Sequence, residues 1–188
     1  ENKIERANQA FRKKKKKSYE KRAIQLERVA NQLEIEKDDL ALLMTREMGK
    51  PIQQAKSEID KCAWVCRYYA ENAEKFLADQ IKESDASKSF VRNNPLGIIL
   101  GIMPWNFPFW QFFRFAAPTL MAGNTVLLKH ASSVMGCAKA IEQLFENADC
   151  SDHIAQSLIT DSSLVEKILD HDAVKGVSLT GSEAAGSA

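Results

Sequence analysis

From Pro95 onward the sequence alternates between short apolar runs and longer segments of helical period. This alternation predicts strands over 96–102, 124–129, 154–159 and 174–179, and helices over about 109–122, 133–147, 162–169 and from Ser182. Strands that alternate with helices pair in parallel through right-handed crossovers. The pattern therefore predicts an α/β fold, with a doubly wound, parallel, Rossmann-like sheet over residues 95–188.

The first 80 residues have helical periodicity instead. We predict one helix over 2–12, a second that begins after the N-cap Ser18, and a third over about Asp38–Met48 that ends at Gly49. Apolar residues from Ile52 to Phe76 then recur at spacings of three and four, which predicts a fourth helix of about seven turns. Its charged residues are irregularly placed, so a helix that lies across a globular core is favoured over a coiled coil. Residues 1–80 are thus predicted to be a helical scaffold.

Length, charge and hydropathy limit the class of partner. A chain of 188 residues, 45% hydrophobic, can bury one core, and a formal net charge of +1 gives no general attraction to nucleic acid or membrane. No window is long and apolar enough to span a bilayer, and no signal peptide opens the sequence, so we expect a cytoplasmic protein with a small-molecule partner. The chain starts without Met and ends early in a predicted helix, which suggests a truncated sequence.

Two features could indicate other functions. Arg12–Lys17 is a run of six cations, but nearby acidic residues cancel its field and no aromatic residues alternate with it, so a solvated turn between helices is favoured over a nucleic-acid site. The cysteines (Cys62, Cys66, Cys137 and Cys150) lack the spacing of a zinc site. Cys62 and Cys66 fall on the apolar face of the long helix, where we expect core packing, and no metal site is predicted.

Polar residues follow three of the predicted strands. Trp105-Asn106 follows the first, Lys129 ends the second with Ser132 just after it, and Thr180-Gly181-Ser182 follows the fourth. The carboxyl ends of parallel strands meet at one edge of a sheet, where α/β proteins bind ligands. Asn106 and Ser182 could instead be simple helix caps, and a cap at Ser182 is compatible with ligand binding.

In these segments the sequence resembles the amino-terminal half of the aldehyde dehydrogenase superfamily. The family motifs match Pro104-Trp105-Asn106-Phe107-Pro108, then 122–129 (Ala-Gly-Asn through Lys129), then Thr180-Gly181-Ser182 with Gly186, in the family's order. The likeness covers nearly all residues. Residues 45–51 and the helix after them are most similar to succinate-semialdehyde dehydrogenases.

The resemblance implies an oxidoreductase that oxidises an aldehyde, most similar to one acting on succinate semialdehyde, with NAD or NADP through a cysteine thiohemiacetal. The family's variant of the fold lacks the Gly-x-Gly-x-x-Gly fingerprint, which is also absent here. Its nucleophilic cysteine and general-base glutamate lie downstream of the matched segments, so these 188 residues are expected to be inactive alone. A non-catalytic nucleotide-binding or interaction fragment remains the alternative. Residues 81–94, with a strand near 89–92, resemble an arm used in subunit association, which implies a homodimer or homotetramer.

The resemblance also implies roles for individual residues. Asn106 would donate a hydrogen bond to the oxyanion of the thiohemiacetal, where such a donor stabilises the transition state by several kcal/mol. Arg114, in an aromatic stretch, would bind the distal carboxylate of the substrate or else extend from the surface as a solvated cation. The residues expected to bind the cofactor are Ile102, Met103, Pro104, Trp105, Asn106, Lys129, His130, Ala131, Ser132, Gly181 and Ser182.

The segment after the second strand bears on the choice between NAD and NADP. The family commonly has Lys-Pro-(Ala or Ser)-Glu there, and the Glu accepts a hydrogen bond from the ribose 2'-hydroxyl. This chain has Lys129-His130-Ala131-Ser132, which removes a carboxylate that would repel a 2'-phosphate. NADP is therefore expected to be tolerated or preferred. His130 replaces the Pro, which leaves the rigidity of the loop and a pH effect of its charge open.

Overall fold

The computed structural model describes residues 2–150 and 153–187. Four helices come first: α1 (Asn2–Lys14), α2 (Tyr19–Ile35), α3 (Lys37–Met48) and α4 (Ile52–Phe76). A hairpin of β1 (Gln80–Ile81) and β2 (Phe90–Val91) follows. The remainder comprises β3 (Ile98–Met103), α5 (Pro108–Met121), β4 (Thr125–His130), α6 (Met135–Asn147), β5 (Ala155–Ser157), α7 (Val165–Leu169), β6 (Val174–Leu179) and α8 (Glu183–Ser187). The 3-10 turns η1 (Ser132–Val134) and η2 (Ser162–Leu164) precede α6 and α7.

The four helices of the scaffold follow the predicted order, and α1 runs two residues past its predicted end at residue 12. Ser18 caps α2, because its side chain accepts a hydrogen bond from the Lys21 amide, and Gly49 ends α3 in the left-handed region at φ 72°. The apolar seam of α4 is buried, with Cys62 and Cys66 fully inaccessible. The prediction that these two cysteines pack in the core is confirmed.

The prediction of a solvated turn over Arg12–Lys17 is wrong in part. Helix α1 continues to Lys14, and the Lys14 side chain is only 2% exposed. Ile4, Ala7 and Ala10 form the buried face of α1, and helical spacing places Lys14 on the same face. Only the end of the cationic run forms the turn before α2.

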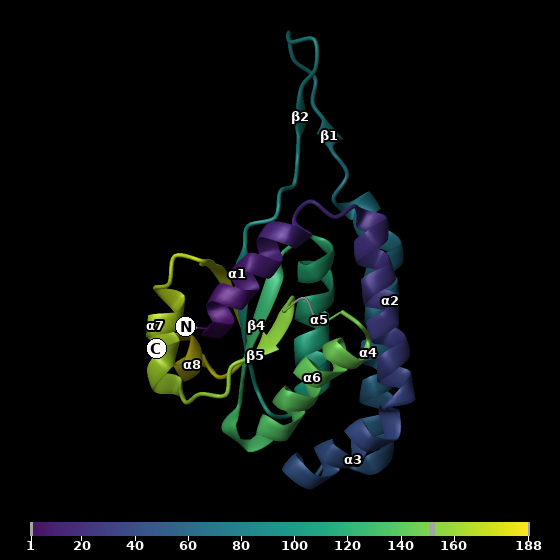
Figure 1. The fold of residues 1–188 in the computed structure, drawn as a ribbon, viewed down its shortest axis with the longest axis vertical. Helices are drawn as coiled ribbons and strands as arrows, with labels where there is room; N and C mark the ends of the chain where they lie inside the picture. Colours follow the sequence, from purple (N-terminus) through teal and green to yellow (C-terminus); the bar gives the residue numbers. More distant parts are fainter. Residues whose placement is uncertain (1, 151–152, 188) are drawn as a thin grey trace.

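The main sheet has four strands in the order β5-β4-β3-β6, all parallel. Helices α5 and α6 cover one face, where Phe109, Phe112 and Phe113 pack with residues of β3 and β4. Helices α1 and α7 cover the other face, through Ile4 and Ile168. Figure 1 shows α1 and α5 with β4 between them. The predicted doubly wound α/β fold with a parallel sheet is confirmed.

Two strands are shorter than predicted, because side chains form hydrogen bonds with backbone groups at their ends or edges. The amides of Leu96 and Gly97 donate to the Asn124 side-chain oxygen at 2.7 and 3.1 Å, so β3 begins only at Ile98. At the sheet edge, β5 has three residues rather than the predicted six. The Lys3 ammonium donates to the Ser157 carbonyl at 2.8 Å, and the Ser157 amide donates to Glu142, which satisfies the outer edge of this strand.

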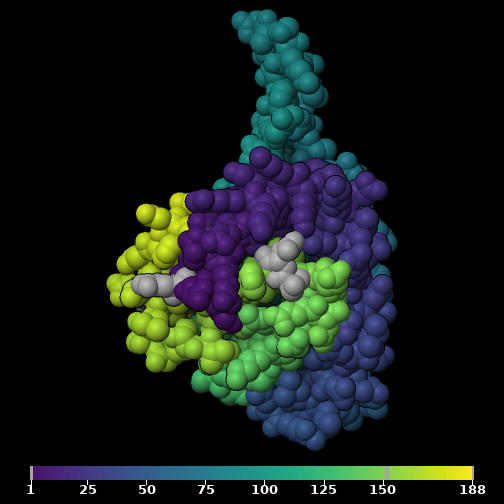
Figure 2. Space-filling view, viewed as in Figure 1, coloured from purple at the N-terminus to yellow at the C-terminus, as the bar shows by residue number. Residues whose placement is uncertain are grey.

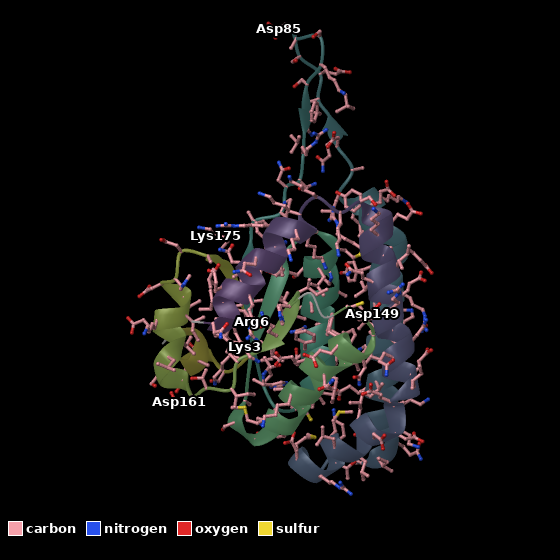
Figure 3. All side chains as sticks on the ribbon, in the orientation of Figure 1. Lys3, Arg6, Asp85, Asp149, Asp161 and Lys175 are labelled. Carbon is pink, nitrogen blue, oxygen red and sulfur yellow. The ribbon has the colours of Figure 1, made fainter. Side chains whose placement is uncertain are left out.

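The hairpin of β1 and β2 projects from the body of the protein (Figure 2). Each strand has only two residues, and Asp85 lies near the tip (Figure 3). Arg92 and Asp79 form an ion pair at its base, with a shortest distance of 2.5 Å. The strand near 89–92 was predicted, whereas β1 was not. No described helix combines the length and the apolar character that a bilayer span requires.

Candidate functional site

The strand order reverses beside β3. Strands β4 and β5 are added on one side of β3 and β6 on the other, so the crevice at the carboxyl ends of β3 and β6 is a topological switch point. Backbone hydrogen bonds fix the segments that leave this edge: the Thr180 amide donates to the Ile102 carbonyl and the Ala131 amide to the Met103 carbonyl, each at 3.0 Å. The edge is therefore held by the sheet itself.

A cavity of about 240 Å³ lies in this crevice. It is lined by Pro104, Trp105, Asn106, Gln111, Thr180, Gly181 and Ser182. The structure thus brings together predicted residues from two strand ends that are more than 70 positions apart in the sequence. The Asn106 side-chain amide has no hydrogen-bond partner among the described residues, so it is available to a ligand.

Most of the polar side chains along this edge of the sheet can donate hydrogen bonds. Asn106 contributes an amide, Thr180 and Ser182 contribute hydroxyls, and Lys129 on β4 pairs in register with Ile102. Ser132 is exposed at the start of η1. Ser182 also accepts a hydrogen bond from the Ala185 amide at 3.3 Å, so it caps α8. This set of neutral and cationic donors fits the phosphates and hydroxyls of a dinucleotide.

One carboxylate near this edge was missed by the sequence analysis. Asp161 follows β5 and is labelled in Figure 3. Hydrogen bonds from Ser163 lower the pKa of its carboxyl group, and the charge of Lys129 lowers it further. An Asp before two serines reads as an ordinary turn in the sequence, so no local signal marked it.

The predicted cofactor contact of His130 is left to its main chain, because its side chain is fully buried. Strand alternation places Lys129 on the face of α1 and α7 and His130 on the opposite face, toward α5. The Ala131 amide donates to Nδ1 at 3.0 Å, so Nε2 carries the proton and donates to the Pro108 carbonyl at 2.9 Å. His130 thus joins the end of β4 to the start of α5. Met103 is likewise buried in the core, so only its main chain faces the edge.

Burial of His130 predicts a specific pH dependence of stability. Desolvation lowers the pKa of His130 below its usual value near 6.5, so the folded state stays neutral while the unfolded state binds a proton. The free energy of unfolding should then fall as pH decreases below about 6.5, by up to about 1.4 kcal/mol per pH unit, and level off below the folded pKa. Urea unfolding of the full-length protein between pH 7.5 and 5 measures this loss.

The matched variants are His130→Asn and His153→Asn. His153 is exposed and has φ 54°, which Asn tolerates, so this control should retain the pH dependence of the wild type. The His130→Asn protein should be less stable at pH 7.5 but lose less of its stability on acidification. Equal slopes for wild type and His130→Asn would contradict the assignment.

A buried ion pair supports the segment that carries Asn106. The Glu58 carboxylate, on α4, accepts hydrogen bonds from the Phe109 and Trp110 amides at 3.0 and 2.9 Å, which caps the first turn of α5. The Lys50 ammonium bonds to the same carboxylate and lies 3.7 Å from the centroid of the Phe107 ring. Glu58 and Lys50 are 4% and 6% exposed. The chain on the carboxyl side of Asn106 is therefore fixed to the scaffold.

A second carboxylate from the scaffold caps α6. Glu47 accepts from the Gly136 amide at 2.7 Å and from the Cys137 amide at 2.8 Å. A Cβ atom at Gly136 would lie 2.5 Å from the nearer carboxylate oxygen, so only glycine allows this approach. Glu47, Lys50 and Glu58 were not predicted as site residues. Glu47 and Lys50 lie within the 45–51 segment that carries the family likeness.

Arg114 lies on the exposed side of α5, and its Nη2 donates to the Thr180 hydroxyl at 2.9 Å. This bond places the predicted substrate-binding cation beside the crevice between β3 and β6. The guanidinium group has further donors that remain open to an anion.

Other cavities lie beyond this crevice. One of about 440 Å³ lies between the starts of α4 and α5 and is lined by Gln53, Gln54, Ser57, Glu58, Lys61, Phe107 and Trp110. Another of about 630 Å³ lies between α1 and α7, beyond the end of β5. Within the described residues, no three His, Cys, Asp or Glu side chains gather as a metal site would require.

The chain resembles known proteins in family, sequence and structure. The family described as the aldehyde dehydrogenase family matches residues 1–188. A probable succinate-semialdehyde dehydrogenase [NADP(+)] of Synechocystis sp. is 47% identical over 98% of this chain and 40% of its own length. Succinate-semialdehyde dehydrogenase [NADP(+)] 1 of Mycobacterium bovis is 47% identical over 97% of this chain and 41% of its own length.

A solved structure agrees with these relatives. The succinic semialdehyde dehydrogenase of Streptococcus pyogenes, in complex with NADP+, superimposes with a TM-score of 0.94 at 36% identity, over 99% of this chain and 41% of that one. The chain thus spans about 40% of the length of the relatives that it matches.

Proposed function

Since the chain belongs to the aldehyde dehydrogenase family, we propose that it is the cofactor-binding part of an enzyme that oxidises succinate semialdehyde to the carboxylate with NADP+ or NAD+. The observation that carries this proposal is the crevice at the switch point, where Trp105-Asn106 and Thr180-Gly181-Ser182 line one cavity. The names of the similar proteins support the substrate and the cofactor.

In this proposal Asn106 is the catalytic residue of the chain. Its unpartnered amide donates to the aldehyde oxygen as negative charge develops on it, and the fixed start of α5 keeps the donor in place. Bound NAD(P)+ supplies the hydride acceptor. Trp105, which is 53% exposed, lines the same crevice next to this donor.

The cysteines of this chain do not suit the role of nucleophile. All four are buried, and desolvation raises the pKa of each thiol, that of Cys150 to about 11. A thiolate, and not a thiol, attacks a carbonyl carbon. We therefore assign the nucleophile and the general base of the complete enzyme to another segment of the protein.

The cofactor would extend along the carboxyl edge of the sheet. Its phosphates would lie at Gly181 and Ser182, its adenosine ribose at Lys129 and Ser132, and its nicotinamide at Pro104–Asn106. The backbone of Ile102, Met103 and Ala131 forms the floor between these points.

We assign the distal carboxylate of the substrate to Arg114. Its remaining N–H groups can bind a carboxylate in a two-pronged geometry beside the crevice. The projecting hairpin of residues 80–91 we assign to subunit association in a homodimer or homotetramer, because its short, exposed strands have no other partner among the described residues.

A Ser132→Glu variant tests the cofactor site. A carboxylate beside the ribose 2'-position should repel a phosphate there, so NADP+ binding to the full-length protein should weaken by about 10- to 100-fold, which is roughly 1.4–2.7 kcal/mol. NAD+ binding should stay within about threefold or improve. Isothermal titration calorimetry with each nucleotide measures both constants.

Ser133→Glu is the matched control, because it adds the same charge one residue farther along the exposed turn. It should change the NADP+ affinity much less than Ser132→Glu. Equal effects on NADP+ and NAD+, or none, would refute the ribose site at Lys129–Ser132.

A further inference from the structure

The cavity between the starts of α4 and α5 is lined by a cation, Lys61, that has no role in the site described above. Lys61, on α4, places its ammonium nitrogen 3.9 Å from the centroid of the Trp110 ring. Trp110 and Phe107 form the aromatic side of this cavity, and Gln53, Gln54 and Ser57 add neutral polar groups. Lys61 has no carboxylate within ion-pair distance among the described residues.

The other charge in the cavity is already neutralised. Glu58 is 4% exposed, bonds to the Lys50 ammonium and accepts two backbone amides of α5. The Lys50 ammonium in turn is committed to this carboxylate and to the Phe107 ring. Lys61 is thus the uncompensated charge of the cavity, which favours an anionic ligand over a neutral or cationic one.

The cavity lies next to the proposed reaction centre. Phe107, which is 45% exposed, follows Asn106 directly and lines the cavity, so a small molecule in it has one end near the Asn106 turn. Trp110 is four positions before Arg114 and therefore lies on the same side of α5. Lys61 on α4 contacts the Trp110 ring, and Arg114, one turn farther along α5, donates to the Thr180 hydroxyl.

We propose that Lys61 is a specificity-determining residue that selects aldehydes with a carboxylate at the far end of the chain. The proposal rests on the proposed function and adds a second cation to it. The Trp110 ring contacts one side of the ammonium group of this exposed lysine, and the remaining N–H donors are open to a carboxylate in the cavity that Lys61 lines. Lys61 then attracts the anionic substrate toward Arg114 and the Asn106 turn.

The test compares two four-carbon aldehydes in the full-length enzyme, succinate semialdehyde and butanal, which differ in the terminal carboxylate. Lys61→Met removes the charge and retains much of the apolar stem. We expect KM for succinate semialdehyde to rise about five- to tenfold at low salt, and KM for butanal to stay within twofold. The KM for succinate semialdehyde should also depend less on salt in the variant than in the wild type. Lys61→Arg should restore most of the loss.

Lys56→Met is the matched control, because Lys56 lies on the same helix but pairs with Asp38 at 2.8 Å. It should leave both KM values within twofold. If Lys61→Met changes KM for both aldehydes equally, or for neither, while the wild type oxidises succinate semialdehyde, the role of Lys61 is refuted and the proposed function stands. A wild type that oxidises neither aldehyde would overturn both proposals.

Discussion

Replacing Asn106 with alanine is expected to lower kcat of the full-length enzyme by about 10²- to 10³-fold, equivalent to about 2.7–4 kcal/mol of transition-state stabilisation. The reason is that the amide donates to an oxygen whose charge develops only during the reaction. The ground-state aldehyde gains little from the same bond, so KM should change by less than about threefold. Steady-state kinetics with succinate semialdehyde and NADP+ measure both constants.

The stability of this variant separates chemistry from folding. Asn106 is exposed and has no protein partner among the described residues, so the melting temperature should stay within about 1 °C of the wild type. Asn106→Asp, which keeps the shape but adds an anion, should lose as much activity as the alanine variant. Asn94→Ala, an exposed substitution outside the crevice, should retain full activity. A kcat within tenfold of the wild type for Asn106→Ala would remove Asn106 from the mechanism.

Truncating Glu58 is expected to destabilise the protein more than any other single change described above. Glu58→Ala leaves the Lys50 ammonium buried without its counter-charge and leaves the Phe109 and Trp110 amides without an acceptor. Loss of one partner from a buried pair costs about 3–5 kcal/mol. The shift of the urea midpoint of the full-length protein measures the loss, and hydrogen exchange at these two amides locates it.

Two comparisons isolate this effect. Glu74→Ala removes an exposed glutamate from the same helix and should cost less than about 0.5 kcal/mol. Combining Lys50→Met with Glu58→Met replaces the pair with apolar side chains, and this double variant should be more stable than Glu58→Ala, because no charge remains buried. If Glu58→Ala has the same midpoint as Glu74→Ala, the ion pair does not hold the start of α5.

Nearly all the helices and strands could be predicted from the sequence, because helix and strand formation here depends on local periodicity and on capping residues. The seam of α4, the cap at Ser18 and the left-handed Gly49 are examples in which a few adjacent residues determine the outcome. The edge residues Asn106, Lys129 and Ser182 were predicted for a related reason. Polar groups that follow apolar strands are visible in the sequence, and parallel pairing brings strand ends together.

The contacts that support the edge could not be predicted in this way. Glu58 meets the Phe109 amide across 51 positions, and Glu47 meets the Gly136 amide across 89. A glutamate on a predicted helix reads as an ordinary solvated residue, and no periodicity distinguishes one that is buried as a cap. The burial of the His130 side chain could not be predicted for the same reason, since it depends on which face of β4 turns toward α5.

The position of β3 at the centre of the sheet has a consequence for synthesis on the ribosome. Leu179, the last residue of β6, leaves the peptidyl transferase centre 76 residues after Met103, the last residue of β3. At about 5–20 residues per second, that interval lasts roughly 4–15 s. During this time β4 and β5 can pair on one side of β3, while its other edge, with Ile98, Ile99 and Leu100, has no partner. The order of translation therefore exposes an apolar strand edge to neighbouring nascent chains on the same polysome, although the finished fold buries it.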